Sequence, residues 1–163
     1  MLRSLCAVAV AASASSMASA GVTGAAIFEI LGDLSVSPSS TPTFNIGGVN
    51  SGLIGPSVPP EYDQFLVTGN ASIAGDLRIN LFNGFTPSLG DSFTLIHALG
   101  SVTFLGSAIA PALPEGLSWQ VTVGTGGAFG PEGSTLVASV VPAPGALALL
   151  ALAGTGGRRS RRR

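Results

Sequence analysis

An alternation of apolar and polar residues with a period of two recurs along the middle of the chain, and it leaves few folds open. It is clearest in residues 76–81, 92–97, 118–123 and 136–140. Side chains two positions apart in an extended chain point to the same face, so this period indicates β-strands with one buried face. Turn-forming pairs such as Asn83-Gly84 separate the segments. No window has a convincing helical repeat, and the sequence predicts an all-β body.

The same alternation predicts which side chains form the core. In residues 92–97 it places Phe93, Leu95 and His97 on one face, opposite Ser92, Thr94 and Ile96. The predicted core residues are Leu77, Ile79, Leu81, Phe93, Leu95 and Trp119. Segments 37–42, 47–60 and 108–116 are rich in Ser, Pro or Gly and are predicted to be irregular.

The N-terminus has the features of a secretory signal peptide. Arg3 provides a positive charge, residues 5–12 are apolar, and Ala18-Ser19-Ala20 is a small-x-small cleavage site. Residues 1–20 are therefore predicted to form a signal helix that is removed, and residues 21–140 to form one exported domain. Removal of this segment also removes Cys6, the single cysteine, so the domain is expected to fold without disulfides.

The C-terminal tail, residues 141–163, joins a proline motif, an apolar segment and a basic cluster. The motif is Val141-Pro142-Ala143-Pro144-Gly145. The apolar residues 145–157 would form a helix of roughly 20 Å, which is shorter than the roughly 30 Å hydrocarbon core of a bilayer. The basic cluster is expected to stay on the cytoplasmic side as a stop-transfer signal; it consists of Arg158, Arg159, Arg161, Arg162 and Arg163.

This order of elements resembles the PEP-CTERM sorting signal of bacterial surface proteins, in a Pro-Ala-Pro variant with Ala143 at the position of the family's glutamate. The resemblance implies processing at the proline motif by an exosortase, a membrane protease-transpeptidase. It implies a protein that is anchored in the membrane through a C-terminal hydrophobic helix before processing, and that is then located at the cell surface or outside the cell. The alternative is a plain single-pass anchor.

A second resemblance covers roughly half of the body. Residues 62–98 contain Tyr62-Asp63, a Gly75-x-Leu77 strand and a loop ending in Gly90-Asp91, and Leu-Pro-x-Gly-Leu-x-Trp follows at 113–119. This is similar to the repeat near the end of autotransporter-type β-helix passengers. It implies a short right-handed parallel β-helix, or solenoid, in which each coil buries its inward side chains against the next. An antiparallel β-sandwich is the alternative, with Asn83-Gly84 as a hairpin turn.

The charge of the body excludes one class of partner. The formal net charge of the chain is −1, but six of its seven basic residues lie in the two terminal segments. The body has eight acidic residues against Arg78 alone, which gives a formal charge of −7. A surface of this sign repels phosphate backbones, so nucleic acid is not an expected partner.

The residues that could carry chemistry form no convincing catalytic set. Asp91, Ser92 and His97 suggest a hydrolase triad, but an odd separation places Ser92 and His97 on opposite strand faces. Glu61 and Asp63 could form a carboxylate pair for glycoside hydrolysis, but they follow a proline-rich loop. We expect no catalytic residues and no enzyme activity.

Metal, cofactor and glycan sites are also not expected. Asp63, Asp76 and Asp91 lie at turns without a calcium-loop pattern, so we expect them to accept turn and cap hydrogen bonds. The chain has one histidine, and its cysteine would be removed with the signal peptide, so we do not expect a transition-metal site. Residues 70–72 match a glycosylation sequon, a pattern that is common by chance.

Two function classes follow. The first is a non-enzymatic cell-surface or extracellular-matrix protein. The second is a carbohydrate-binding module for exopolysaccharide, which would need Trp119 and Tyr62 exposed on one face.

The signal-peptide interpretation predicts the first residue of the exported protein. Because the small-x-small site ends at Ala20, N-terminal sequencing of protein recovered outside the cytoplasm should begin at Gly21. An exported chain that still begins at Met1 would contradict this interpretation.

Overall fold

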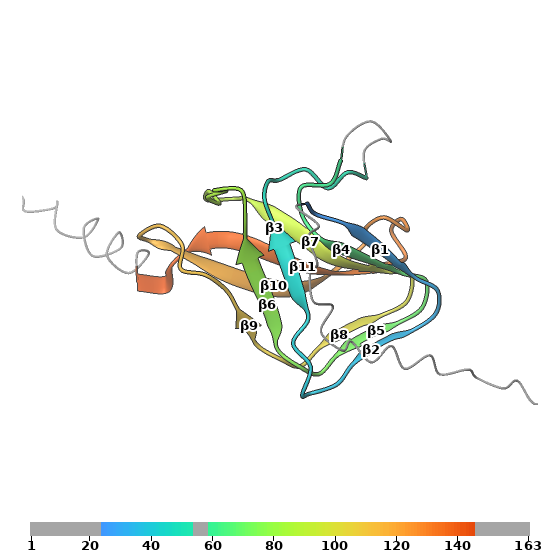
Figure 1. Cartoon of the computed structure of the whole chain (residues 1–163). Helices are drawn as coiled ribbons and strands as arrows, with labels where there is room; N and C mark the ends of the chain where they lie inside the picture. The colour runs from blue at the N-terminus through green and yellow to red at the C-terminus, as the bar shows by residue number, and fades with distance from the viewer. Residues whose placement is uncertain (1–23, 54–58, 146–163) are drawn as a thin grey trace, which may run out of the picture.

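The computed structural model describes residues 24–53 and 59–145, and it confirms the predicted all-β body (Figure 1). The predicted signal helix, and the hydrophobic helix and arginine cluster beyond Gly145, lie outside these residues. In the described ranges, no helix is long and apolar enough to cross a membrane. The eleven strands of these ranges are β1 Ile27–Ile30, β2 Leu34–Val36, β3 Thr43–Ile46, β4 Gln64–Val67, β5 Ala71–Ile73, β6 Leu77–Leu81, β7 Ser92–Ala98, β8 Val102–Phe104, β9 Ala108–Ile109, β10 Leu117–Thr125 and β11 Ser134–Pro142.

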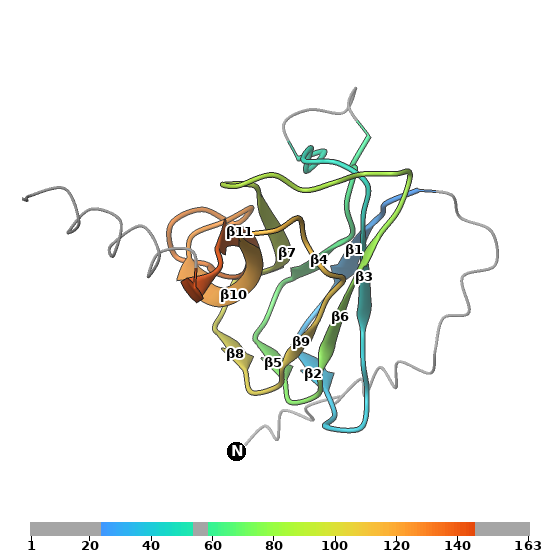
Figure 2. The ribbon, with the colours of Figure 1, turned by 90° about the vertical axis from the view of Figure 1, so that its left-hand side faces the viewer.

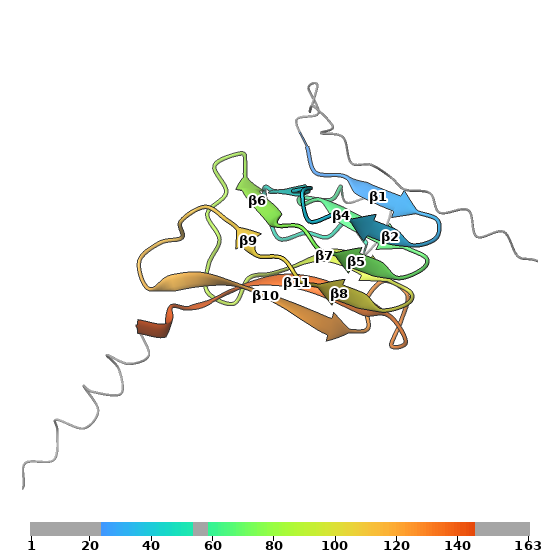
Figure 3. The ribbon, with the colours of Figure 1, turned by 90° about the horizontal axis from the view of Figure 1, so that it is seen from below.

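The strands form three sheets that surround a common interior (Figure 2). Sheet A has the order β1-β4-β7-β11-β10, sheet B the order β2-β5-β8 and sheet C the order β3-β6-β9. The polypeptide passes through sheets A, B and C three times in this sequence, and we call the three passages rounds. All pairs between one round and the next are parallel, and Figure 3 shows the three strands of sheet B side by side.

Strand β6 lies between two parallel neighbours in sheet C. It pairs in parallel with β3 on one side and with β9 on the other, whereas a sandwich would pair it antiparallel with a sequence neighbour. Asn83 and Gly84 do form a tight turn, with φ values of 53° and 70°. This turn joins β6 to β7, which belong to different sheets, so it makes no hairpin. The segment 76–81 is therefore a central strand of a parallel sheet.

Glycines allow the rounds to approach at the corner between sheets A and B. The Gly69 N–H donates to the carbonyl of Gly32 at 2.9 Å, and the Gly100 N–H donates to the carbonyl of Gly69 at the same distance. A Cβ atom on Gly69 would lie 2.8 Å from the Gly32 carbonyl oxygen, and one on Gly100 would lie 3.0 Å from that of Gly69. A larger residue would push the rounds apart at this corner.

A polar ladder follows these glycines. The Asp33 Oδ1 atom accepts from the Asn70 N–H at 2.7 Å, and the Asn70 Oδ1 atom accepts from the Ser101 N–H and hydroxyl, both at 2.9 Å. The three positions are separated by 37 and then by 31 residues. Each is the second residue of a shared pattern of glycine, a polar residue, an apolar residue, Ser or Thr, and an apolar residue. This internal repeat was not recognised in the sequence, because its polar residue differs in each round and its spacing is unequal.

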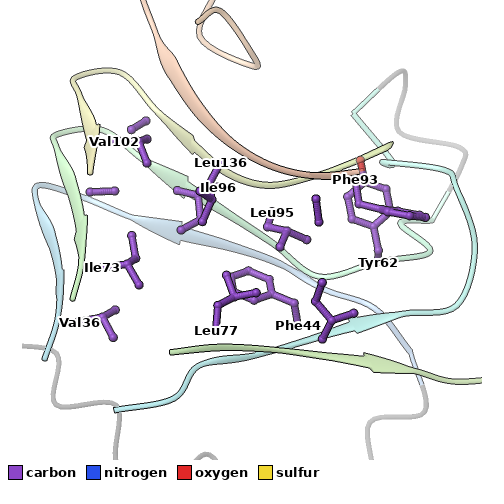
Figure 4. Close-up of a cluster of buried hydrophobic side chains, with 14 of the residues drawn as sticks. Val36, Phe44, Tyr62, Ile73, Leu77, Phe93, Leu95, Ile96, Val102 and Leu136 are labelled. Atoms are coloured by element: carbon purple, nitrogen blue, oxygen red, sulfur yellow. The ribbon is translucent and has the colours of Figure 1, made fainter. Parts of the chain in front are cut away.

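The apolar residues of the pattern stack in the interior of the body. Leu34, Ala71 and Val102 are partners in adjacent strands, and Val36, Ile73 and Phe104 form the next stack. Figure 4 shows side chains from all three sheets meeting in one cluster. Of the predicted core residues, Leu81 and Trp119 are half-buried against the cluster. The others are buried as predicted: Leu77, Ile79, Phe93 and Leu95.

A β-bulge in β7 contradicts the predicted face of His97. Leu136 pairs with Ile96 but Val137 pairs with Thr94, so Leu95 is an extra residue in β7. Leu95 and Ile96 are both buried, and the alternation is reversed after them. His97 consequently lies on the outer face of sheet A and Ile96 in the core, the opposite of what strict alternation predicted.

The hairpin β10–β11 continues sheet A beyond the third round. β11 pairs antiparallel with β7 and with β10, and both hairpin strands also contact β8. Leu136, Ala138 and Val140 of β11 are buried, as the alternation in 136–140 predicted. The inward side of the hairpin therefore covers the interior after the third round.

The close packing of the corners predicts a position where a methyl group is not tolerated. A Cβ on Gly106 would overlap the backbone carbonyl of Gly75 in the preceding round. We expect Gly106→Ala to lower the free energy of unfolding by about 1–3 kcal/mol in urea titrations, because backbone must move. Gly24→Ala is the matched control, since a Cβ at Gly24 has no neighbour within 4 Å. Equal stabilities of the two variants would contradict this account of the corners.

Candidate functional site

The three residues considered as a hydrolase triad do not converge. The bulge places Ser92 and His97 on the same outer face, so the predicted opposition of their faces was wrong. Nevertheless, each residue has a different partner. The Asp91 carboxylate accepts the Ser88 N–H at 2.8 Å, and the Ser92 hydroxyl is 3.3 Å from that of Ser139. These contacts give neither a nucleophile–base pair nor a base–acid pair.

His97 belongs to a buried polar network on the outer face of sheet A. Its Nδ1 atom accepts the Ala128 N–H at 3.0 Å, which leaves the proton of a neutral ring on Nε2. That Nε2 atom is 3.3 Å from Oε1 of Gln64, which is fully buried, and the Gln64 amide donates to the Ser51 carbonyl. The network therefore connects the 126–133 loop with the segment around Ser51, through β7 and β4.

Burial of this network favours the neutral imidazole. Desolvation lowers the pKa of His97 below its usual value of 6.5. A protonated ring would also have to turn a donor toward the Ala128 N–H, which is itself a donor. His97 thus holds the 126–133 loop against the sheet. Its role is structural: Nδ1 accepts a hydrogen bond from Ala128, and Nε2–H donates one to Gln64.

Asp63 is the most connected carboxylate of the body. Its side chain is 6% exposed; Oδ1 accepts the Ala26 N–H at 2.8 Å, and Oδ2 accepts the Asn45 N–H at 2.9 Å and the Asn45 Nδ2–H at 2.8 Å. Asn45 Oδ1 in turn accepts from Asn80 at 2.9 Å. Asp63 therefore joins the segment before β1 to β3, at the position where β4 begins. Glu61 instead accepts from the Asn50 N–H, so the two do not form a carboxylate pair.

The aspartates considered as calcium ligands lie at separate corners. Asp76 accepts the Ser107 N–H at 3.0 Å and Asp91 accepts that of Ser88, so both take part in turn hydrogen bonds as expected. Over residues 24–53 and 59–145, no group of three or more His, Cys, Asp or Glu side chains could hold a metal ion. Asn70 of the sequon contributes its side chain to the polar ladder.

The aromatic residues proposed as a sugar platform pack inward. Tyr62 is 3% exposed and makes an edge contact with Phe93, with ring centroids 5.4 Å apart. Burial raises the pKa of the Tyr62 hydroxyl, against a smaller lowering by hydrogen bonds to the Thr94 backbone and Ser51. Trp119 lies over Phe93 at 5.9 Å, and its Nε1–H donates to the Pro111 carbonyl at 3.1 Å. Tyr62 and Trp119 thus do not form an exposed platform.

The segment 141–145, predicted from the sequence to be a sorting motif, begins inside the last strand. Val141 and Pro142 are the final residues of β11, opposite Ser118 and Leu117 of β10. The Ala143 N–H donates to the carbonyl of Gly116 at 2.8 Å. Pro144 and Gly145 are exposed. The motif is therefore divided between a paired half and an exposed half, a division that the sequence did not indicate.

Comparison of the sequence with models of known protein families and with curated proteins finds no match. A function for this protein therefore has to be argued from its own motifs and geometry. Asp63 and His97 are engaged in contacts between strands and loops, while Pro144 and Gly145 at the end of the described residues are exposed.

The buried network predicts a pH dependence of stability. Because the folded pKa of His97 is lowered, the unfolded chain binds more protons in the window below about pH 6.5. The free energy of unfolding should therefore be constant above this window and should fall as the pH is lowered through it. We expect urea titrations between pH 7.5 and 5.5 to show this fall, and His97→Gln to abolish it, since His97 is the only histidine. A slope that His97→Gln leaves unchanged would refute the assignment.

Proposed function

We propose that this is an exported, non-enzymatic protein of the cell surface or extracellular matrix, delivered by a PEP-CTERM-like tail. The observation that carries this proposal is the continuity between the body and the motif. β11 runs without interruption into Pro142, and the exposed Pro144 and Gly145 follow at once. The apolar segment and the five arginines come next in the sequence. The motif thus stands between a folded body and a membrane-directed segment, where a sorting enzyme would need it.

The body is proposed to be a short right-handed parallel β-helix. Its support is the register, in which equivalent residues of successive rounds are partners in all three sheets. Corner glycines and a polar ladder recur in each round, as a solenoid requires of its turns. In this proposal the hairpin β10–β11 is the C-terminal cap.

A display role, with no chemistry of its own, agrees with how the polar groups are used. Asp63 accepts three hydrogen bonds that join the segment before β1 to β3, and His97 bonds to Gln64 of β4 and to Ala128 of the 126–133 loop. Groups engaged in this way support a scaffold, whereas a catalytic acid or base has to face a substrate. The inward packing of Tyr62 and Trp119 likewise favours the surface-protein class over an exopolysaccharide-binding module.

The proposed partners are an exosortase-type membrane enzyme and, transiently, the membrane itself. Residues 145–157 would enter the bilayer, and the arginine cluster would remain on the cytoplasmic side. A segment this short is a marginal permanent anchor, which suits a precursor that is held only until it is processed. After processing the body would be released to the surface or the matrix.

Two exposed prolines provide a test: Pro144 follows β11, and Pro131 lies in the loop between β10 and β11. Pro144→Ala changes the exposed half of the motif but leaves the apolar segment and the arginines intact, and Pro131→Ala is the control, an exposed proline in the β10–β11 loop. If the tail is a sorting signal, unprocessed precursor should accumulate in Pro144→Ala cells, by several-fold over wild type on immunoblots. The amount of precursor in Pro131→Ala cells should stay at the wild-type level. If wild-type surface protein retains its sequence through Arg163 in mass spectra, the protein has a plain anchor instead.

A further inference from the structure

We infer that the sorting enzyme cuts this protein after Ala143 or a later residue, because the fold withholds the first half of the motif from cleavage. The inference rests on the proposed function, and it specifies where within that site the covalent step takes place. In this step water adds to the carbonyl carbon of the new C-terminal residue. The C–N bond breaks, and the nitrogen of the next residue takes up a proton and leaves with the tail.

The backbone of β11 is held by fewer contacts as it approaches the tail. At Val140 the strand has neighbours on both sides: Val140 is the register partner of Trp119 in β10, and on the other side its N–H donates to the Asp91 carbonyl while its carbonyl accepts the Gly90 N–H. Within the part of the chain that the structure describes, the backbone of Val141 and Ala143 is bonded on the β10 side alone. Pro144 and Gly145 are exposed.

The position of Pro142 fits this one-sided pairing. The bond from the Ala143 N–H to Gly116 marks a hydrogen-bonded pair, and such pairs alternate along an antiparallel ladder. Ser118 and Val141 are then also a hydrogen-bonded pair, and Pro142 faces Leu117 in a non-bonded pair. The backbone nitrogen of Pro142 therefore points away from β10, to the side where the pairing of β11 with β7 has already ended at Ser92. Pro142 can therefore end the strand without breaking its pairing to β10.

Pairing of this kind protects a peptide bond. A protease binds its substrate as an extended strand whose backbone groups are free to bond with the enzyme. Here Val141 pairs with Ser118 and the Ala143 N–H donates to Gly116, while the backbone groups of Val140 are bonded to Asp91 and Gly90. Val140 is also 1% exposed in the core. A cut at or before Pro142 would require β11 to be peeled from β10, whereas a cut after Ala143 leaves the sheet intact.

Cleavage after Ala143 also preserves the cap of the body. The mature protein would keep Val141, Pro142 and Ala143, and with them the pairing of β11 to Ser118 and Gly116. The pairing of β11 with β10 is complete only when the hairpin has formed. Cleavage would therefore be directed to the bond after Ala143 only in a folded body.

The first test is the C-terminal residue of mature protein recovered from the surface or medium of the producing cells. Mass spectrometry should find a protein that ends at Ala143 or later and lacks the arginine cluster. A mature protein ending at Pro142 or earlier would overturn the inference while leaving the sorting proposal in place. A protein that is intact through Arg163 would refute the sorting proposal itself, and the inference with it.

A matched glycine pair tests whether the Gly116 turn is what protects the motif. Gly116 and Gly130 have φ values of +84° and +93°, and a Cβ at either meets no atom within 4 Å. Alanine therefore introduces similar left-handed strain at each, but only Gly116 supplies the carbonyl that binds Ala143. We expect Gly116→Ala, in the full-length precursor in micelles, to speed amide exchange at Ala143 by roughly 5- to 30-fold, with Gly130→Ala close to wild type.

The same pair tests the cut site in cells. Gly116→Ala should add mature proteins that end before Ala143, and Gly130→Ala should not. Identical exchange rates at Ala143 in the two variants, or identical cleavage patterns, would overturn the role assigned to the β10–β11 end.

Discussion

Everything in this body depends on the close approach of one round to the next at its corners. Parallel strands need a spacing of about 4.8 Å, and that spacing is reached only if the turns between strands can stack as closely as the strands do. Gly69 and Gly100 meet this requirement because a side chain there would strike the carbonyl of the preceding round. The polar ladder from Asp33 through Asn70 to Ser101 then supplies partners for turn N–H groups of the later rounds. The core forms inside the frame that these corners set.

The sequence was informative about strands and less informative about their arrangement. Alternation in 76–81 and 136–140 identified β6 and β11 and their buried faces, because a regular strand translates period two directly into burial. The same rule failed at His97, since a single extra residue at Leu95 reverses every later face and leaves no mark in composition. Parallel pairing was anticipated from a family resemblance, and periodicity alone does not distinguish it from antiparallel pairing.

The candidate site was predictable only in part, because the sequence pattern indicates local contacts but not contacts between distant residues. Asp91 was expected to accept a turn hydrogen bond, and it does, because short carboxylates beside turns commonly satisfy nearby N–H groups. Asp63 was expected to do the same, but it accepts from Ala26 and Asn45, which are 37 and 18 positions away. The network of His97 with Gln64 and Ala128 could not be foreseen, since it joins residues 31 and 33 positions apart. The division of the predicted sorting motif was also not visible in the sequence, because a proline suggests that a strand ends before it, whereas β11 includes Val141 and ends at Pro142 itself.

The stacked corners also give the molecule a unit of growth. The step from Asn70 to Ser101 is 31 residues, and it returns the polypeptide to an equivalent corner with the same side chains facing inward. Tandem duplication of such a step would add one strand to each sheet and lengthen the body by about 4.8 Å, while the hairpin and the tail stayed as they are. A gene for this architecture thus has a simple route to longer or shorter descendants, in which the length of the body changes by whole rounds.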